Sequence, residues 1–393
     1  MINLRTRAMG WLLPAAIFAA TTAWSLGLEV RFYPQNTVRA HEVESRRGWS
    51  SVLLQNLAIV NNSAEILTLD RVELDLIADG EAIQTQRIFG KDLELAAKKG
   101  AGLQKAGLLD LLGFHFRPDV LLLGDIKLSP ERQLAPKAAL LITYRYFTFA
   151  GHPERIRVRI LARNDTGKDV DGEGFISVSF FKSEVNYAFP VKGRAFIGTG
   201  QSLHQGHRWA VPEEFALDIA RIGEGGLTYH RDSDRRTNYF AYGTEVQSVA
   251  DGTVLAVQDS LPESDESLRR PSEGDEAYFQ RVLKMQDEFF SKGPLMAAGN
   301  YVVIQHTARE FSFYAHLIPG SVKVAKGEKV QKSQFIGRLG HSGNSTEPHL
   351  HFQVSDGPDP LYSAGLPMHF ENVQLPLADG PREIQSGDIV QTR

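Results

Sequence analysis

The sequence predicts a mainly β protein with two domains: a β-sandwich-like N-terminal domain, then a compact antiparallel β-sheet with a helical and loop insertion. From about residue 30 to 185, apolar and polar residues alternate with period two, which is typical of strands that bury one face. Beyond about residue 190, short apolar stretches recur between glycines, as in a small sheet with tight turns. A chain of 393 residues is long enough for two such cores.

The composition narrows the range of functions. The net charge of -4, without any basic run, gives no reason to expect nucleic-acid binding. Cysteine is absent, so disulfides and cysteine-ligated zinc are excluded. A metal would have to be bound by His, Asp or Glu.

Residues 1–28 are predicted to be a signal peptide or an N-terminal membrane anchor. Arg5 and Arg7 precede an apolar run over residues 9–20, and small residues lead to a cleavage point after Ala23. The run is short for a membrane span. We therefore expect an exported protein of the periplasm or cell envelope, with inner-membrane association if the segment is retained.

Residues 29–189 are predicted to form the sandwich-like domain. The apolar phase slips by one residue at Asp70-Arg71, which indicates a β-bulge. The leucine-rich segment 91–113 is expected to be helical. No His, Asp or Glu cluster stands out in this region, so a structural or binding role is expected.

Residues 190–370 are predicted to form the second domain. Six short strands are expected, over residues 245–250, 253–257, 301–305, 311–314, 335–339 and 349–354. The insert 258–297 contains an amphipathic helical pattern and is too long for a hairpin loop, which favours a lid or cleft wall. Residues 371–393 are expected to be a C-terminal tail.

The candidate chemistry lies in three histidines of this second domain. His349 and His351 are two residues apart on a predicted strand, so both side chains point to one face, with their Cα atoms roughly 7 Å apart. Such spacing suits one imidazole on a metal and one handling a proton. Together with His316, these histidines could supply one metal ligand and two catalytic groups. An Asp and another His would then have to complete the metal site.

Several ordered motifs, over roughly residues 200–360, resemble the core of lysostaphin-type (LytM-type) zinc endopeptidases. They are Tyr242-Gly243-Thr244, Gly299-Asn300-Tyr301, Tyr314-Ala315-His316-Leu317, Gly340-His341-Ser342-Gly343 and Pro348-His349-Leu350-His351-Phe352. The resemblance implies a Zn²⁺ cofactor and cleavage of peptide cross-links in peptidoglycan. It also implies that His351 binds the metal, that His349 is the general base and that His316 stabilises the oxyanion.

The first metal motif departs from that family, which usually carries His-x-x-x-Asp. His230 and Asp234 keep the spacing, but polar neighbours suit a solvated loop. Asp218 has apolar neighbours on a predicted strand, and a strand gives a metal carboxylate rigid support. We therefore favour Asp218 with His207 as the histidine, and His204 second.

Two further expectations follow. His306, His341 and His369 are expected to be ordinary surface or turn residues. The irregular first motif leaves a second function open, that of a catalytically degenerate family member that regulates or scaffolds other cell-wall hydrolases.

Overall fold

The computed structural model describes residues 27–44, 47–111, 113–117, 122–201, 206–380 and 382–393. The expected signal or anchor lies outside these residues except for its last two positions, and Leu28 already begins the first strand. His204 also lies outside them. In the described part of the chain, no helix is both long and apolar enough to cross a membrane.

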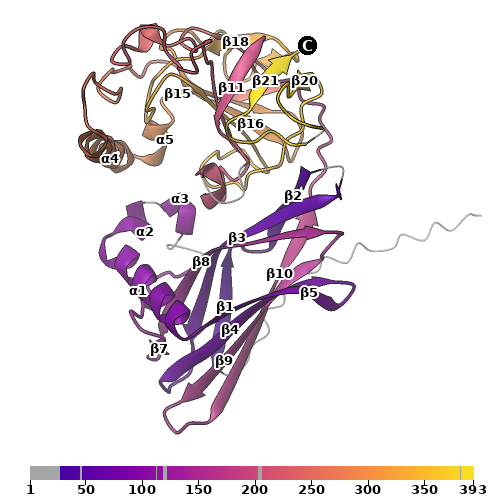
Figure 1. Cartoon of the computed structure of the whole chain (residues 1–393), viewed down its shortest axis with the longest axis vertical. Coiled ribbons are helices and arrows are strands. Elements are labelled where there is room, and N and C mark those ends of the chain that lie inside the picture. The colour runs from indigo at the N-terminus through magenta and orange to yellow at the C-terminus, as the bar shows by residue number, and fades with distance from the viewer. Residues whose placement is uncertain (1–26, 45–46, 112, 118–121, 202–205, 381) are drawn as a thin grey trace, which may run out of the picture.

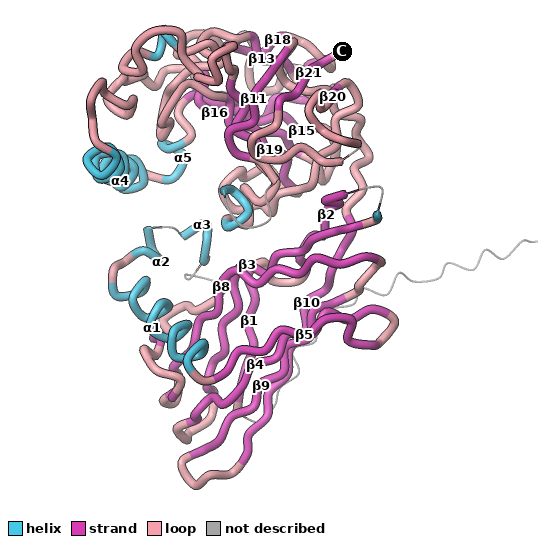
Figure 2. Tube along the Cα trace, viewed as in Figure 1, coloured by secondary structure: helices cyan, strands magenta, loops and turns pink. Residues whose placement is uncertain are grey.

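Strands dominate both halves of the chain, which confirms the mainly β class (Figure 2). The N-terminal half contains β1 (Leu28–Tyr33), β2 (Thr37–Glu44), β3 (Trp49–Asn61), β4 (Leu67–Ala78), β5 (Glu81–Phe89), β6 (Lys127–Leu128), β7 (Gln133–Leu134), β8 (Ala138–Ala150), β9 (Arg155–Asn164) and β10 (Asp169–Phe180). They form a 10-stranded sheet in the order β5-β4-β9-β10-β2-β3-β8-β6, with β1 on β3 and β7 on β4.

This sheet folds over on itself, so that its two halves enclose one apolar core (Figure 1). The crossing is tight where β1 meets β10, since a Cβ added to Gly174 would lie 2.6 Å from Val30 Cβ. The register between β4 and β9 shifts between Leu69 and Arg71, which confirms the predicted bulge. Three helices follow β5: α1 (Lys91–Lys105), α2 (Leu108–Leu111) and α3 (Gly113–Phe116), as expected for residues 91–113.

The C-terminal half forms a second sheet in which every strand pair is antiparallel, as predicted. Its strands are β11 (Arg194–Thr199), β12 (Leu217–Ala220), β14 (Gly252–Gln258), β15 (Asn300–Gln305), β16 (Phe311–Leu317), β17 (Lys329–Val330), β19 (Leu350–Ser355), β20 (Val373–Gln374) and β21 (Ile389–Thr392). Their order is β17-β14-β15-β16-β19-β12-β11-β21-β20. A separate pair, β13 (Glu245–Gln247) and β18 (Phe335–Arg338), packs on the same core.

The insert 258–297 contains α4 (Asp275–Ser291) and α5 (Pro294–Ala297), which lie together at one side of the second sheet (Figure 1). Residues 371–393 differ from the expected tail. Val390 is fully buried, and β21 pairs with β11. This strand could not be predicted from the sequence, because four residues are too few to show an alternating pattern.

Candidate metal centre and catalytic histidines

The second sheet brings the candidate site together through the register of three neighbouring strands. His351 lies on β19, opposite Asp218 on β12 and opposite Ala315 on β16. His316 follows Ala315 on β16, and His349 immediately precedes β19. The structure therefore places His316, His351 and Asp218 on adjoining strands in the middle of the sheet, with His349 just before one of them.

His207 joins this group from a 3-10 helix over Gly206–Trp209. His207 Nε2 lies 2.9 Å from Asp218 Oδ2, and His351 Nδ1 lies 3.2 Å from Asp218 Oδ1. One ligand atom from each of these three residues lies within 4.8 Å of the others. Catalytic zinc sites have this arrangement, in which three protein ligands leave one coordination position open.

The alternative ligands His230 and Asp234 are not part of this cluster, which among the described residues consists of His207, Asp218 and His351. His230 is exposed, and its ring packs against Phe240 with 5.4 Å between centroids. Asp234 lies in the same polar loop, as its neighbours in the sequence suggested.

Hydrogen bonds on the outer side of the cluster fix which nitrogen of each ligand faces inward. His351 Nε2 donates to Gln353 Oε1 at 2.9 Å, and the Gln353 amide donates to the Pro360 carbonyl at 2.8 Å. This leaves the His351 Nδ1 lone pair facing Asp218. His207 Nδ1 likewise faces Glu213 Oε2 at 3.2 Å, which turns Nε2 inward. Such outer partners orient metal-binding imidazoles.

The inward nitrogen of His207 provides a test of whether a metal fits. His207 Nε2 is buried, and its 2.9 Å contact with Asp218 Oδ2 is an ion-pair contact that lacks hydrogen-bond geometry. A buried polar atom without a hydrogen bond is costly, and a shared cation would satisfy this nitrogen and the carboxylate together. The three side chains therefore fit a metal ion of the zinc type.

His316 and His349 form a second pair beside the cluster, with 4.7 Å between ring centroids. His316 Nδ1 donates to the Ser342 carbonyl at 2.8 Å, and His349 Nδ1 donates to the Glu347 carbonyl at 2.7 Å. In both rings Nε2 is thus left to exchange protons, and His349 Nε2 lies 3.5 Å from Asp218 Oδ1.

The backbone at His316 is strained, with φ of 63°, a left-handed conformation that is uncommon for a residue with a side chain. Two backbone hydrogen bonds enforce it: His316 N donates to Ala298 O, and Gly340 N donates to His316 O, both at 3.0 Å. Strain of this kind persists only where the surroundings impose it, often at functional sites.

The charges of the site favour an ionised carboxylate. Burial by itself raises the pKa of Asp218, but the neighbouring His207 and His349 outweigh burial and hold that pKa well below its usual range. Burial opposes a charged His207 ring, yet Asp218 and Glu213 raise its pKa to about 10 while no metal is bound, so a metal would have to displace this proton. Burial lowers the pKa of His316 well below its ordinary value, and His349 and His351 add to that effect.

The sequence of this region matches a known family. Residues 288–362 match the model of peptidase family M23. We call the second domain, which contains this match, the M23 domain. A 96-residue segment is 34% identical to the peptidoglycan DD-endopeptidase ShyA of Vibrio cholerae, and a 55-residue segment is 46% identical to ShyC of the same organism.

These alignments are short in relation to the whole proteins. The ShyA match covers 24% of this chain and 20% of ShyA, and the ShyC match covers 14% and 12%. A zinc-containing peptidase of Vibrio cholerae aligns over 86% of both chains, at 15% identity and a TM-score of 0.27, which is too low to relate the two folds.

A cleft of about 360 Å³ opens onto the centre of the M23 domain. His207, Asp218, His349 and His351 form part of its lining. Gln286 and Phe290 of α4 line it as well, so the insert contributes a wall of the cleft. From the N-terminal domain, His115 of α3 reaches the same cleft.

One hydrogen-bonded chain in the M23 domain was not anticipated from the sequence. Ser267 Oγ donates to His341 Nε2 at 3.0 Å, and His341 Nδ1 donates to Ser345 Oγ at 2.9 Å. Ser345 Oγ in turn donates to the Glu347 carbonyl, at 2.7 Å, which also holds His349. His341 is only 1% exposed, so it is not the surface or turn residue that we expected.

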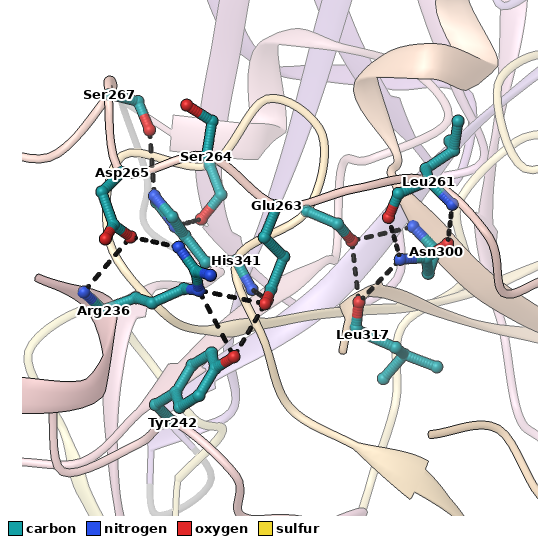
Figure 3. A network of polar contacts seen from close by, with 12 residues as sticks. Arg236, Tyr242, Leu261, Glu263, Ser264, Asp265, Ser267, Asn300, Leu317 and His341 are labelled. Atoms are coloured by element: carbon teal, nitrogen blue, oxygen red, sulfur yellow. Dashed lines mark hydrogen bonds and ion pairs between the residues drawn. The ribbon is translucent and has the colours of Figure 1, made fainter. Parts of the chain in front are cut away.

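Glu263 anchors the same chain to the insert (Figure 3). Its Oε1 accepts from the His341 backbone N–H at 2.6 Å, and its Oε2 accepts from Tyr242 at 2.7 Å and faces Arg236 at 3.1 Å. A Cβ added to Gly340 would lie 2.5 Å from Glu263 Oε1. The glycine is therefore needed for this close approach.

Sequence reasoning also missed Glu213 and Gln353. Gln353 could have been found from the sequence, because it lies two residues after His351 and therefore on the same face of the strand. Glu213 could not have been found in this way, since its contact with His207 depends on how residues 207–216 turn.

Proposed function

We propose that this protein is a zinc-dependent endopeptidase that hydrolyses peptide cross-links of bacterial peptidoglycan. The observation that carries the proposal is the convergence of His207, Asp218 and His351, next to the pair His316 and His349. The M23 domain and its relatives ShyA and ShyC, which are peptidoglycan DD-endopeptidases, support the substrate class.

In this proposal His207 Nε2, the Asp218 carboxylate and His351 Nδ1 hold the zinc. Bound there, zinc lowers the pKa of a water molecule and polarises the scissile carbonyl. His349 Nε2 takes the proton from the attacking water, because the Glu347 carbonyl already holds the proton on Nδ1.

His316 faces the same substrate position from the neighbouring strand. Its lowered pKa keeps the ring neutral in the resting site, with the ring proton on Nδ1 bonded to Ser342, so Nε2 can donate to the developing oxyanion only once it gains a proton during the reaction. The proton that His349 takes from the water supplies Nε2 of the adjacent His316 ring and then passes to the leaving amine.

The His351→Ala variant tests this proposal. We expect it to lose bound zinc and to stop releasing muropeptides from peptidoglycan, because it removes one of three ligands. The measurements are metal content of the purified protein and chromatography of released fragments. His230→Ala is the matched control and should retain both properties. Unchanged zinc and unchanged release in His351→Ala would contradict the assignment.

A second candidate function is that of a degenerate family member that regulates or scaffolds cell-wall hydrolases. It is favoured by the irregular first motif, where Glu214 instead of a histidine stands four residues before Asp218. This function predicts a purified protein without stoichiometric zinc whose cleft still binds a partner. One zinc per chain would rule it out.

We further propose that the protein acts in the periplasm or cell envelope, where its substrate lies. The charged and apolar pattern of residues 1–28 supports export, with association at the inner membrane if the segment is retained. Recovery of the protein solely from the cytoplasmic fraction of cells would contradict this placement.

A further inference from the structure

The segment between His207 and Asp218 is wound into three successive tight turns. Ala210 N donates to His207 O at 3.0 Å, Glu213 N to Ala210 O at 3.1 Å, and Ala216 N to Glu213 O at 2.8 Å. This winding brings residues that are six positions apart side by side. The unusual distance in sequence between the two ligands is thereby taken up by a compact, ordered loop.

Two side-chain pairs cross this loop next to each other. His207 and Glu213 form the first pair and line the cleft at the metal cluster. Arg208 and Glu214 form the second, with 3.0 Å between Arg208 NH2 and Glu214 Oε1. The second pair is buried, with side-chain exposures of 0% and 5%. A buried ion pair is tolerable only where further hydrogen bonds complete it.

The N-terminal domain supplies those hydrogen bonds. Arg208 NH1 donates to Ser51 Oγ at 2.9 Å, and Gln55 Nε2 donates to Glu214 Oε2 at 2.7 Å. Both partners lie on β3 and are fully buried. Val52 and Leu54 enter the N-terminal core, whereas Ser51 and Gln55 reach the second domain.

Apolar contacts attach the same loop to the N-terminal domain. Val211 belongs to an apolar cluster that otherwise consists mainly of N-terminal residues, among them Val60 and Leu141. The Phe215 ring packs edge-on against His41 of β2, with 5.5 Å between centroids. The loop that carries His207 is therefore held from the N-terminal side at Arg208, Val211, Glu214 and Phe215.

We propose that Ser51 and Gln55 are positioning residues for the metal centre, which makes metal affinity dependent on contact between the two domains. The inference rests on the proposed function, because it assumes that His207 binds the metal. Arg208 Nε already has no hydrogen bond with the described residues, so without these two partners the buried Arg208–Glu214 pair loses two more hydrogen bonds and the loop relaxes. His207 must then be ordered again when the metal binds, which lowers affinity.

The test is zinc affinity of the metal-free, full-length protein, measured by competition with a chelator. Gln55→Met keeps the side-chain volume but removes the donor to Glu214, and we expect roughly tenfold weaker binding. Ser51→Ala removes one acceptor and should weaken binding by a smaller factor in the same direction. Ser50→Ala and Gln84→Met are matched controls, since Ser50 neighbours Ser51 and the Gln84 amide bonds Thr148 O within the N-terminal domain.

The possible outcomes separate this inference from the function on which it rests. If the wild type takes up zinc and both folded variants bind it equally tightly, the positioning role is wrong and the proposed function stands. If the controls weaken binding as much as the variants, the positioning role is also wrong. A wild type that binds no zinc overturns both. If Gln55→Met does not fold, as judged by circular dichroism, the milder Ser51→Ala decides.

Discussion

At the scale of single residues, the site depends on outward hydrogen bonds as much as on the inward ligands. His351 is the clearest case, because Gln353 fixes its ring and the Pro360 carbonyl fixes the Gln353 amide. A neutral imidazole without such a partner can turn or change tautomer, which would point a proton at the metal.

Removal of this support should weaken the metal site without removing a ligand. We expect Gln353→Leu to bind zinc about 10- to 100-fold more weakly than the wild type, as is common for outer partners of metal ligands. The same chelator competition measures it. Gln334→Leu, in a turn of the same domain, is the control. Equal affinity in Gln353→Leu and the wild type would show that His351 is oriented by other contacts.

The spacing of the site residues along the chain explains which of them could be predicted from the sequence. His349 and His351 were recognisable because strand alternation fixes the face of each side chain. The contact between His207 and Asp218 follows from a wound loop, and no local pattern encodes three successive turns of that kind. His341 was misjudged because its burial depends on Glu263 and Ser267, which lie more than 70 positions away.

At the scale of elements, one loop over residues 340–347 holds both proposed catalytic histidines. Its carbonyls at Ser342 and Glu347 accept the Nδ1 protons of His316 and His349. The loop packs closely on the end of α5 and on the turn before β15, since a Cβ added to Gly343 would lie 2.4 Å from both Ala297 O and Gly299 N. His341 ties the loop to the insert through Ser267 and Glu263.

His341 should therefore act on catalysis through His349. We expect His341→Leu, which removes both ring nitrogens, to lower kcat about tenfold or more, because small displacements of a catalytic group are costly. His341→Asn places an amide donor near the Nδ1 position and should restore most of kcat. The measurements are kcat and KM on purified muropeptides, together with Tm. Equal losses in both variants, in proportion to Tm, would indicate a purely structural role.

Some elements of the fold could be predicted from local sequence patterns, and others could not. The bulge at Asp70 and the helical segment after residue 91 were predictable because both interrupt a local period. The short strand β21 was not, since it is recognised only through its pairing with β11.

At the scale of the whole molecule, the interface between the domains contains an unusual buried histidine. His41 lies on β2 opposite Ser51, beside Arg208 and the ring of Phe215. Burial, and then the charge of Arg208, lower the pKa of His41 well below its ordinary value. Protonation would place a second cation next to Arg208 in the interface.

The lowered pKa of His41 determines the direction in which the stability of the fold changes with pH. A histidine whose pKa is depressed in the folded state binds its proton more readily when unfolded, so stability falls as pH drops below about 6.5. We expect the metal-free protein to lose at most about 1.4 kcal/mol per pH unit from His41 below that value. Urea unfolding between pH 7 and 5 measures the loss, and His41→Gln should reduce the slope.

Other buried histidines contribute to the same trend. Burial lowers the pKa of His115 and of His341 to about 4, so both disfavour protonation in the folded state. They remain in the His41→Gln variant, and the difference between the two slopes therefore isolates His41. Identical slopes would mean that His41 is protonated equally in the folded and unfolded chains.

The pairing of β12 with β19 also determines when the site can come into being. Asp218 and His351 are 133 positions apart in the chain, so bringing them together closes a long loop at a large cost in chain entropy. We expect pairings of this range to form late in folding, because the entropy of closing the loop must be offset by contacts within the intervening chain. We therefore expect the candidate metal site to form in the final stages of folding, so that a nascent or partly unfolded chain does not yet bind the metal.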